Sequence, residues 1–304
     1  DSRSRKTPKW MKRLQIIDST TITLFSNLLF KGVGRHPKTG KKKGGIKVHT
    51  VIHANEGVPS DIKFTSAATN DSFMLRPATL NKGDIMAMDR AYIDYEKFQQ
   101  LTERGVIYVT KMKKSLKYTV LDDMMYQTPD GLMEVRIQNV EFVKQKNGGE
   151  TIRHKARIIT YCDIRKHKLI SLLTNDMDSD PDETIAIYSQ RWEIELLFKQ
   201  MKQNFPLKYF YGESANAIKI QIWVTLIANL LLMVMQKGLK RQWSFSGLAT
   251  MVRITLMYYV DFYSLFNNPE KDWEIMLLRH QVRRQNHRSL TEGAWKSEKQ
   301  VRPP

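Results

Sequence analysis

The chain has 304 residues, of which 41% are apolar, and its 49 Lys and Arg against 31 Asp and Glu give a net charge of +18. These numbers predict a globular protein with a large core, while the single cysteine, Cys162, excludes a disulfide framework and a cysteine-based metal site within the chain. The excess positive charge indicates a polyanionic partner, with nucleic acid as the first candidate and an anionic membrane surface as the second.

The chain begins with a basic segment and then a short apolar strand. Residues 1–13 are basic and unpatterned, which indicates a flexible arm or the end of a missing N-terminal module. Residues 14–18 read as a buried strand that ends in Asp18. Open α/β sheets place their chemistry at such strand ends, although an Asp there also commonly caps a turn. The Gly-rich loop at 31–47 carries seven Lys or Arg and no acid, so it is either a strip along a nucleic-acid backbone or a solvated turn.

A β-hairpin is predicted next. Residues 46–53 alternate between apolar and polar side chains, and after a turn at 55–57 a second strand covers 61–65. His49 and His53 fall on one face of the first strand, but no third ligand lies nearby in the sequence. We therefore favour a structural role for both histidines over a metal site.

The pattern then changes to alternating strands and helices. Asn70 and Asp71 suit the start of a helix over 72–80, and residues 85–89 form a second buried strand that ends in an acid, Asp89. A helix over 92–104 and a third strand over 106–110 follow. Such a β-α-β arrangement predicts parallel strands, so Asp18 and Asp89 should lie at the same edge of one sheet.

Residues 111–178 have the composition of a β-rich insertion. Val, Ile, Thr and Tyr alternate with charged residues in four predicted strands, at 132–137, 140–144, 156–161 and 168–174. Turn signals at Pro129–Gly131 and Asn147–Gly149 separate them. Basic side chains gather at the start of the insertion, among them Lys111, Lys113, Lys114 and Lys117.

One helix is predicted over residues 188–202, after the helix-start signal of Asp180, Pro181 and Asp182. At about 100° per residue, one stripe of this helix carries Tyr188, Arg191, Glu195 and Lys202, beside an apolar face. A solvated salt-bridge face would show the same residue types. The position of the stripe at the margin of the core favours binding of a ligand that is both metal-bearing and anionic, such as a phosphodiester.

Two apolar helical runs near 218–240 and 246–266 follow, and a basic mobile tail is expected over 279–304. Lys219, Gln221, Thr225 and Asn229 interrupt the first run, so we interpret it as a buried core helix and not as a membrane span.

Three acids distant in the sequence, Asp18, Asp89 and Glu195, converge if this topology is right. Three carboxylates leave room for two Mg²⁺ ions with substrate phosphate oxygens, and Mn²⁺ would substitute. Two such ions support an in-line phosphoryl transfer. In this interpretation the carboxylates hold metal, and the surplus Lys and Arg hold DNA.

The spacing of Tyr188, Arg191, Glu195 and Lys202 resembles the Tyr-Arg-Glu-Lys signature of DDE-type insertion-sequence transposases. The flanking residues agree with it: Asp18-Ser19-Thr20-Thr21, Asp89-Arg90-Ala91-Tyr92 and Thr174-Asn175. The resemblance covers about residues 14–240. It implies an α/β fold with an RNase H-like mixed sheet flanked by helices, in which 14–110 and 179–270 form the catalytic core with its C-terminal helices. The β-strand insertion, 111–178, precedes the last catalytic helix.

The resemblance also implies a function. It makes Asp18, Asp89 and Glu195 the metal-binding catalytic residues, while Tyr188, Arg191 and Lys202 contact DNA; Lys111 and Lys113 are expected to add DNA contacts. The implied enzyme is a Mg²⁺-dependent DNA transposase that cleaves element ends and transfers strands. Its expected partners are double-stranded DNA, as terminal inverted repeats and target, and a second copy in the synaptic complex, with no membrane. The expected location is the bacterial cytoplasm, near the nucleoid.

Relatives that form DNA hairpins stack a flipped base on an insertion-domain Trp. Residues 111–180 contain none, so Tyr126, Phe142 and Tyr161 are the candidates for that role. Two other functions stay open. A catalytically silent DNA-binding remnant is disfavoured because all three acids are present, and a different RNase H-like nuclease is disfavoured by the stripe that begins at Tyr188.

Overall fold

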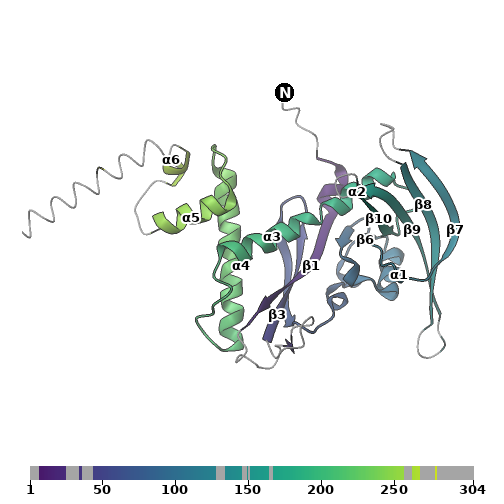
Figure 1. Ribbon diagram of the computed structural model, residues 1–304, viewed down its shortest axis with the longest axis horizontal. Coiled ribbons are helices and arrows are strands. Elements are labelled where there is room, and N and C mark those ends of the chain that lie inside the picture. Colours follow the sequence, from purple (N-terminus) through teal and green to yellow (C-terminus); the bar gives the residue numbers. More distant parts are fainter. Residues whose placement is uncertain are drawn as a thin grey trace, which may run out of the picture. The chain divides into compact units, whose positions relative to one another are not determined.

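The computed structural model describes residues 7–24, 34–35, 44–127, 134–145, 149, 151–163, 167–256, 262–267 and 278. The chain divides into two compact units between Val224 and Thr225. The first unit is a mixed α/β structure in which helices accompany one large sheet (Figure 1). Most of the basic loop expected at 31–47, and all of the tail expected at 279–304, lie outside the described residues.

The N-terminal strands form an antiparallel group. They are β1 (Leu14–Thr23), β2 (Gly34–Arg35), β3 (Gly44–His53) and β4 (Val58–Ser66). Strand β3 pairs with β1, β2 and β4, which confirms the predicted hairpin. Strand β1 is longer than we expected, and Asp18 lies in its middle instead of at its end. The reason is that antiparallel pairing with β3 continues through Asp18 as far as Thr23.

The next two strands confirm the predicted parallel arrangement. Strand β1 pairs in parallel with β5 (Ile85–Met88), and β5 pairs in parallel with β6 (Ile107–Lys111). Helix α1 (Tyr95–Glu103) connects them and begins where the Asp94 side chain accepts hydrogen bonds from two backbone N–H groups. Its Phe98 ring stacks on Tyr108 of β6, with ring centroids 4.0 Å apart, in the core of the sheet.

Two segments differ locally from the prediction. The helix expected over 72–80 is instead a pair of 3-10 helices, Asp71–Met74 and Pro77–Thr79, because Pro77 lacks an N–H and disfavours helical geometry at Arg76. Where we expected only a basic arm, Lys9–Arg13 form a 3-10 helix with Trp10 buried.

The strands of 111–178 continue the same sheet. They are β7 (Thr119–Gln127), β8 (Glu134–Gln145), β9 (Thr151–Asp163) and β10 (Lys168–Thr174). Strand β10 pairs with β6 on one side and β9 on the other, which gives the order β2-β3-β1-β5-β6-β10-β9-β8-β7, with β4 on β3. Strand β8 joins two strands that we predicted separately. Strand β7 was missed, and its side chains are almost all exposed, so it lacks a buried apolar face to signal it.

The helix predicted over 188–202 is in fact two helices, so this prediction was wrong. Helix α2 (Pro181–Ser189) ends before Gln190, and α3 (Trp192–Asn204) begins after Arg191. The backbone tightens at the junction, where Gln190, Arg191 and Glu193 each donate to the carbonyl three residues earlier. Tyr188 and Glu195 therefore lie on different helices.

The remaining helices are α4 (Ala215–Gly238), α5 (Phe245–Thr255) and α6 (Phe262–Asn267). We expected the segment of α4 to be a buried core helix, but Trp223, Ile227 and Leu231 are exposed. Within the described ranges α4 is also the one helix that is long and apolar enough, by length and composition, to cross a bilayer. The polar residues within it had led us to predict that it is not.

Candidate active site

Strand pairing places Asp18 and Asp89 beside each other. The parallel pairing of β1 and β5 ends at Ile17 and Met88, and the residue that follows each of them is an acid, Asp18 or Asp89. Asp89 then leaves the sheet as the residue before the 3-10 helix Arg90–Tyr92. The two carboxylates thus mark the edge at which β5 ends, as the sequence predicted.

Helix α3, which packs on β1, brings Glu195 and Arg191 to this edge. Arg191 Nη1 lies 3.2 Å from Asp18 Oδ2, and Arg191 Nη2 donates to Glu195 Oε1, one helical turn away. The side chains of Arg191 and Asp18 are each only 18% exposed. One guanidinium therefore bridges two of the three predicted acids.

The break between α2 and α3 has an electrostatic consequence for Glu195. It places this residue in the first turn of α3, where the dipole of that helix favours negative charge. In one continuous helix from residue 181 the same carboxylate would lie in mid-helix.

The three acids are close enough to affect one another. Burial raises the pKa of Asp18 to about 6, opposed by the hydrogen bond from the Ser19 N–H and by Arg191, while Asp89 and Glu195 raise it further. Within the described residues, no three His, Cys, Asp or Glu side chains are placed so that they could hold a metal ion as they stand. Two of the acids, Asp18 and Glu195, instead bind the Arg191 guanidinium.

Tyr188 and Lys202 lie on different helices and relate differently to this cluster. The Arg191 guanidinium stands over the Tyr188 ring, 5.7 Å from its centroid, and burial raises the pKa of the phenol. Lys202 lies seven residues beyond Glu195, about 10 Å along α3. It is exposed, and partial desolvation lowers its pKa. The stripe predicted from one helix is thus divided: Tyr188 and Arg191 join the acids, and Lys202 stands apart.

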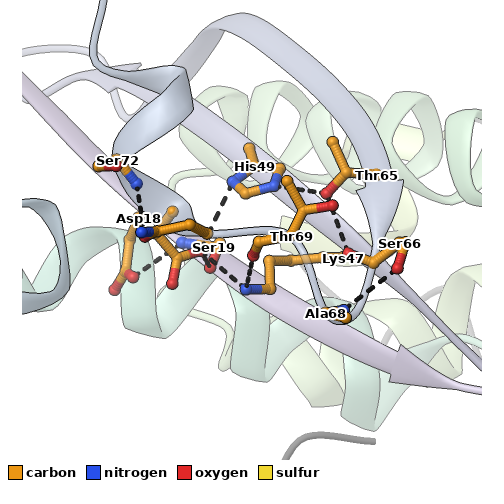
Figure 2. Close-up of polar contacts among 11 residues, drawn as sticks. Asp18, Ser19, Lys47, His49, Thr65, Ser66, Ala68, Thr69 and Ser72 are labelled. Atoms are coloured by element: carbon orange, nitrogen blue, oxygen red, sulfur yellow. Dashed lines mark hydrogen bonds and ion pairs between the residues drawn. The ribbon is translucent and has the colours of Figure 1, made fainter. Parts of the chain in front are cut away.

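A buried polar cluster next to Asp18 was missed by the sequence analysis. Asp71 Oδ1 accepts a hydrogen bond from Ser19 Oγ at 2.6 Å and lies 3.2 Å from Lys47 Nζ. His49 is fully buried, with Nε2 2.7 Å from Thr65 Oγ1, and burial lowers its pKa to about 4. Figure 2 shows Ser19, Lys47 and His49 converging beside Asp18. Asp71 had been read only as part of a helix start.

Lys111 and Lys113 lie together in a basic cavity of about 310 Å³. Its other polar lining residues are Arg90, Lys114, Lys168, Tyr118 and Ser171, and no carboxylate lines it. Arg90, which lines the cavity, directly follows Asp89 in the chain. An anion would relieve the repulsion among five cationic side chains in such a hollow.

The three aromatic residues considered for base stacking differ in exposure. Phe142 is 1% exposed and stacks on Tyr95, so the prediction that it could serve as an accessible platform is wrong. Tyr126 and Tyr161 are half-buried, and burial raises the pKa of Tyr161 to about 12.

Known proteins resemble this chain over most of its length. The family model described as "Transposase DDE domain" matches residues 9–231. A putative transposase, y4zB, of Sinorhizobium fredii is 27% identical over 236 residues, covering 77% of this chain and 63% of the relative. The probable transposase for insertion sequence element IS5377 of Geobacillus stearothermophilus is 24% identical, covering 79% and 61%. The chain thus spans about three fifths of the length of these relatives.

Among solved structures, a cryo-EM structure of the piggyBac transposase synaptic complex with hairpin DNA is similar to the chain. Its TM-score is 0.45 at 11% sequence identity, and the match covers 84% of this chain and 56% of that one.

Proposed function

Because this chain belongs to the family of transposase DDE domains, whose model matches residues 9–231, we propose that it is the catalytic region of an insertion-sequence transposase. It cleaves DNA at the ends of its element and joins the freed strand to a target by metal-dependent phosphoryl transfer. The observation that carries the proposal is that Asp18 and Asp89 each follow the last registered pair of the parallel strands β1 and β5, while Glu195 is bound to the same arginine as Asp18.

We propose an RNase H-like catalytic core for the first unit. The antiparallel group β4-β3-β1, continued by the parallel strands β5 and β6 with α1 between them, supports this assignment. Strands β7 to β10 then form the insertion before the helix that carries Glu195, at 111–178. The match to the Tyr-Arg-Glu-Lys signature group is also part of this proposal.

The donor set of the cluster fits divalent cations. Asp18, Asp89 and Glu195 would hold them, since Mg²⁺ and Mn²⁺ prefer carboxylate oxygens. Burial is the main cause of the raised pKa of Asp18, and Asp89 and Glu195 add a smaller contribution of negative charge that a cation would offset. When bound, two such ions would activate the attacking oxygen and stabilise the leaving oxygen. Arg191 already places positive charge between two of these carboxylates.

The protein's own groups orient the acids and the DNA. The Ser19 N–H donates to Asp18 Oδ1 at 2.7 Å, which holds that carboxylate toward the strand edge. DNA phosphates compete with the acids for Arg191, because a guanidinium binds phosphate oxygens as well as carboxylates. Binding of DNA thereby frees Asp18 and Glu195 from Arg191. Lys202, about 10 Å beyond Glu195 along α3, contacts a more distant phosphate.

The basic cavity gives the DNA strand a path beside the acids. Lys111 and Lys113 contribute to it with Arg90, which follows Asp89 directly. Contacts from such lysines add affinity that depends on salt and not on base sequence. The partners in this proposal are the terminal repeats of the element and a target duplex, with two copies of the chain pairing two ends.

The test is cleavage of element-end DNA by the purified protein in Mg²⁺ or Mn²⁺. Asp89→Ala and Glu195→Ala are expected to bind the DNA in EDTA at least as tightly as the unmutated protein and to lose nicking and strand transfer by at least about 1,000-fold, because each removes a metal ligand. Cleavage that survives either substitution refutes the three-acid assignment. DNA binding without any cleavage by the unmutated, full-length protein would instead identify a catalytically silent remnant.

A further inference from the structure

We propose that Asp71 is a positioning residue for the acid cluster, which holds the Asp18 carboxylate in place through Ser19. The proposal rests on the proposed function in one respect, namely that Asp18 is a metal ligand. It adds a residue that belongs to none of the motifs on which that function depends. Asp71 lies 53 residues after Asp18 in the sequence and opens the 3-10 helix Asp71–Met74.

Asp71 contacts two side chains, Ser19 on β1 and Lys47 on β3, and lies near a third, the neutral imidazole of His49. Its Oδ1 accepts the Ser19 hydroxyl at 2.6 Å, lies 3.2 Å from Lys47 Nζ and lies 3.6 Å from His49 Nδ1. Lys47 also donates to the Thr69 carbonyl at 2.7 Å, which ties the loop before Asp71 to strand β3 (Figure 2). The carboxylate of Asp71 is thus held between β1 and β3 and has little freedom to move.

Ser19 passes this constraint to Asp18. The Ser19 hydroxyl is bound to Asp71, and the Ser19 backbone N–H donates to Asp18 Oδ1 at 2.7 Å. The other carboxylate oxygen of Asp18 is bound to Arg191. If Arg191 leaves to bind a phosphate, the Ser19 N–H is the contact that keeps the carboxylate oriented, and Asp71 is what fixes Ser19.

Tyr92 gives an independent sign that Asp71 and Asp18 share one buried environment. The side chain is fully buried, and among the described residues its hydroxyl has no hydrogen-bond partner. Burial raises its pKa, and Asp18, Asp71 and Asp89 raise it further, so the phenol stays protonated. The Ser19 side chain opposes this rise in the pKa, so Tyr92 senses Ser19 and the three carboxylates together.

Stability alone accounts poorly for this cluster. The Lys47 and Asp71 side chains are 11% and 21% exposed, and a buried ion pair of this kind generally adds little net stability compared with apolar residues of the same size. Groups that orient a metal-binding carboxylate, in contrast, typically contribute about 10- to 100-fold to metal affinity or activity. The proposal predicts an effect of that size on substitution.

The experiment compares Ser19→Ala, which removes the hydroxyl bound by Asp71, with Ser19→Thr, which keeps a hydroxyl. Ser60→Ala is the control, since it deletes the hydroxyl of an exposed serine on β4, which donates to the Val51 carbonyl at 3.3 Å on the other side of β3. Mn²⁺ binding to DNA-free protein is measured by the electron paramagnetic resonance of free Mn²⁺. DNA affinity in EDTA and single-turnover cleavage are measured in parallel.

We expect Ser19→Ala to weaken Mn²⁺ binding by about 10-fold or more, to lower the cleavage rate similarly, and to leave DNA affinity in EDTA within about twofold of the unmutated protein. Ser19→Thr should recover most of the loss, and Ser60→Ala should show none. The proposal is overturned if Ser19→Ala binds Mn²⁺ as tightly as the unmutated protein. It is also overturned if Ser19→Ala and Ser60→Ala lose Mn²⁺ affinity equally, which would indicate a general structural effect.

Asp71→Asn separates position from charge and keeps the test decisive if Ser19→Ala folds poorly. The amide oxygen still accepts from Ser19, so Mn²⁺ binding should fall less than in Asp71→Ala, and Ser19→Ala should add little to Asp71→Ala. Full additivity of these two substitutions overturns the proposal. If the unmutated protein binds Mn²⁺ but cleaves no DNA, the proposed function fails, while the Mn²⁺ series still decides whether Asp71 positions Asp18.

Discussion

At the scale of single residues, Arg191 decides the charge of the acid cluster in the absence of other cations. It binds Asp18 and Glu195 with its two terminal nitrogens, while its buried Nε has no hydrogen-bond partner among the described residues. A guanidinium with one buried donor unsatisfied is not held in an optimal position. This favours a side chain that changes partners when DNA arrives.

Replacing Arg191 by Ala is therefore expected to have opposite effects on two ligands. Without the guanidinium, repulsion among Asp18, Asp89 and Glu195 grows, so DNA-free protein should bind Mn²⁺ more tightly, on the order of tenfold or about 1.4 kcal/mol. DNA affinity in EDTA should fall by a similar factor. Calorimetry measures the Mn²⁺ affinity, and fluorescence anisotropy of labelled DNA measures the DNA affinity.

The control for this prediction is Lys155→Ala, which removes one exposed positive charge on β9. It should change neither affinity by more than about twofold, because exposed charges are screened beyond about 10 Å. Mn²⁺ binding by Arg191→Ala that is unchanged or weaker would show that the guanidinium does not oppose cations at the cluster.

His154 gives a prediction for the dependence of stability on pH. It is fully buried, with Nε2 2.6 Å from the Tyr108 hydroxyl and Nδ1 3.1 Å from Gln99 Oε1, and burial lowers its pKa to about 4. The unfolded chain takes up this proton near pH 6.5, so the stability contributed by neutral His154 is present above that pH and is lost as the pH falls toward 4.

Between pH 6 and 4.5 the free energy of unfolding of the unmutated protein should therefore fall more steeply than that of His154→Gln. The difference in slope is expected to reach about 1.4 kcal/mol per pH unit. Asp18, with a raised pKa, acts in the opposite sense, since its contribution is lost as the pH rises through about 6, but it is common to both proteins and cancels. Urea unfolding at several pH values measures the slopes, and equal slopes would contradict the assignment.

At the scale of secondary structure elements, Asn175 connects the end of β10 to its neighbours. Its Oδ1 accepts the Tyr108 N–H at 2.9 Å, and its Nδ2 donates at 2.9 Å both to the Val106 carbonyl and to Thr102 Oγ1. One side chain thus joins β10 to β6 and α1, just before the chain continues into the helices that carry Tyr188 and Glu195.

Asn175→Ala is expected to lower the free energy of unfolding by about 2–4 kcal/mol, because it leaves the Tyr108 N–H and the Val106 carbonyl without a side-chain partner. Asn175→Asp keeps the acceptor for Tyr108 but places an oxygen against the Val106 carbonyl, so it should recover only part of the loss. Urea denaturation of the three proteins measures this. A loss below about 0.5 kcal/mol for Ala would show that water replaces these bonds at little cost.

At the scale of the whole molecule, acidic and basic side chains gather at different places. The net charge is +18, yet the acids Asp18, Asp89 and Glu195 meet at one sheet edge, and a cavity lined by five cations lies beside Asp89. In the proposed function, the net positive charge and the basic cavity attract DNA, and the three acids attract metal ions. Added salt weakens the attraction of DNA much more strongly than the binding of metal ions.

The salt dependence of DNA binding measures how many phosphates the basic cavity holds. Replacing Lys113, Lys114 and Lys168 by Gln should lower the slope of log affinity against log salt by up to about 2.7, or 0.9 for each lost contact. Lys202→Ala should lower it by about one, and Lys155→Gln should leave it unchanged. An unchanged slope in the triple variant would place the DNA elsewhere.

Much of this organisation could be predicted because it depends on local sequence. Apolar runs of four or five residues identified the cores of β1, β5 and β6, and a β-α-β order implies parallel strands, so the placement of Asp18 and Asp89 at one edge of the sheet followed. The hairpin of β3 and β4 followed from alternation and a turn signal. Strand β7 and the two 3-10 helices after residue 70 were missed, because the first has no buried face and Pro77 breaks the helical pattern of the second.

The sequence by itself thus determined which acids could form a site and that the chain carries a large excess of positive charge. Only the tertiary structure decided that Arg191 lies between Asp18 and Glu195, that the helix divides so that Glu195 starts α3, and that Asp71 reaches Ser19. The physical reason is range. Periodicity and propensity act over a few neighbouring residues, whereas these contacts join side chains up to 173 positions apart, and their geometry exists only once the sheet has formed.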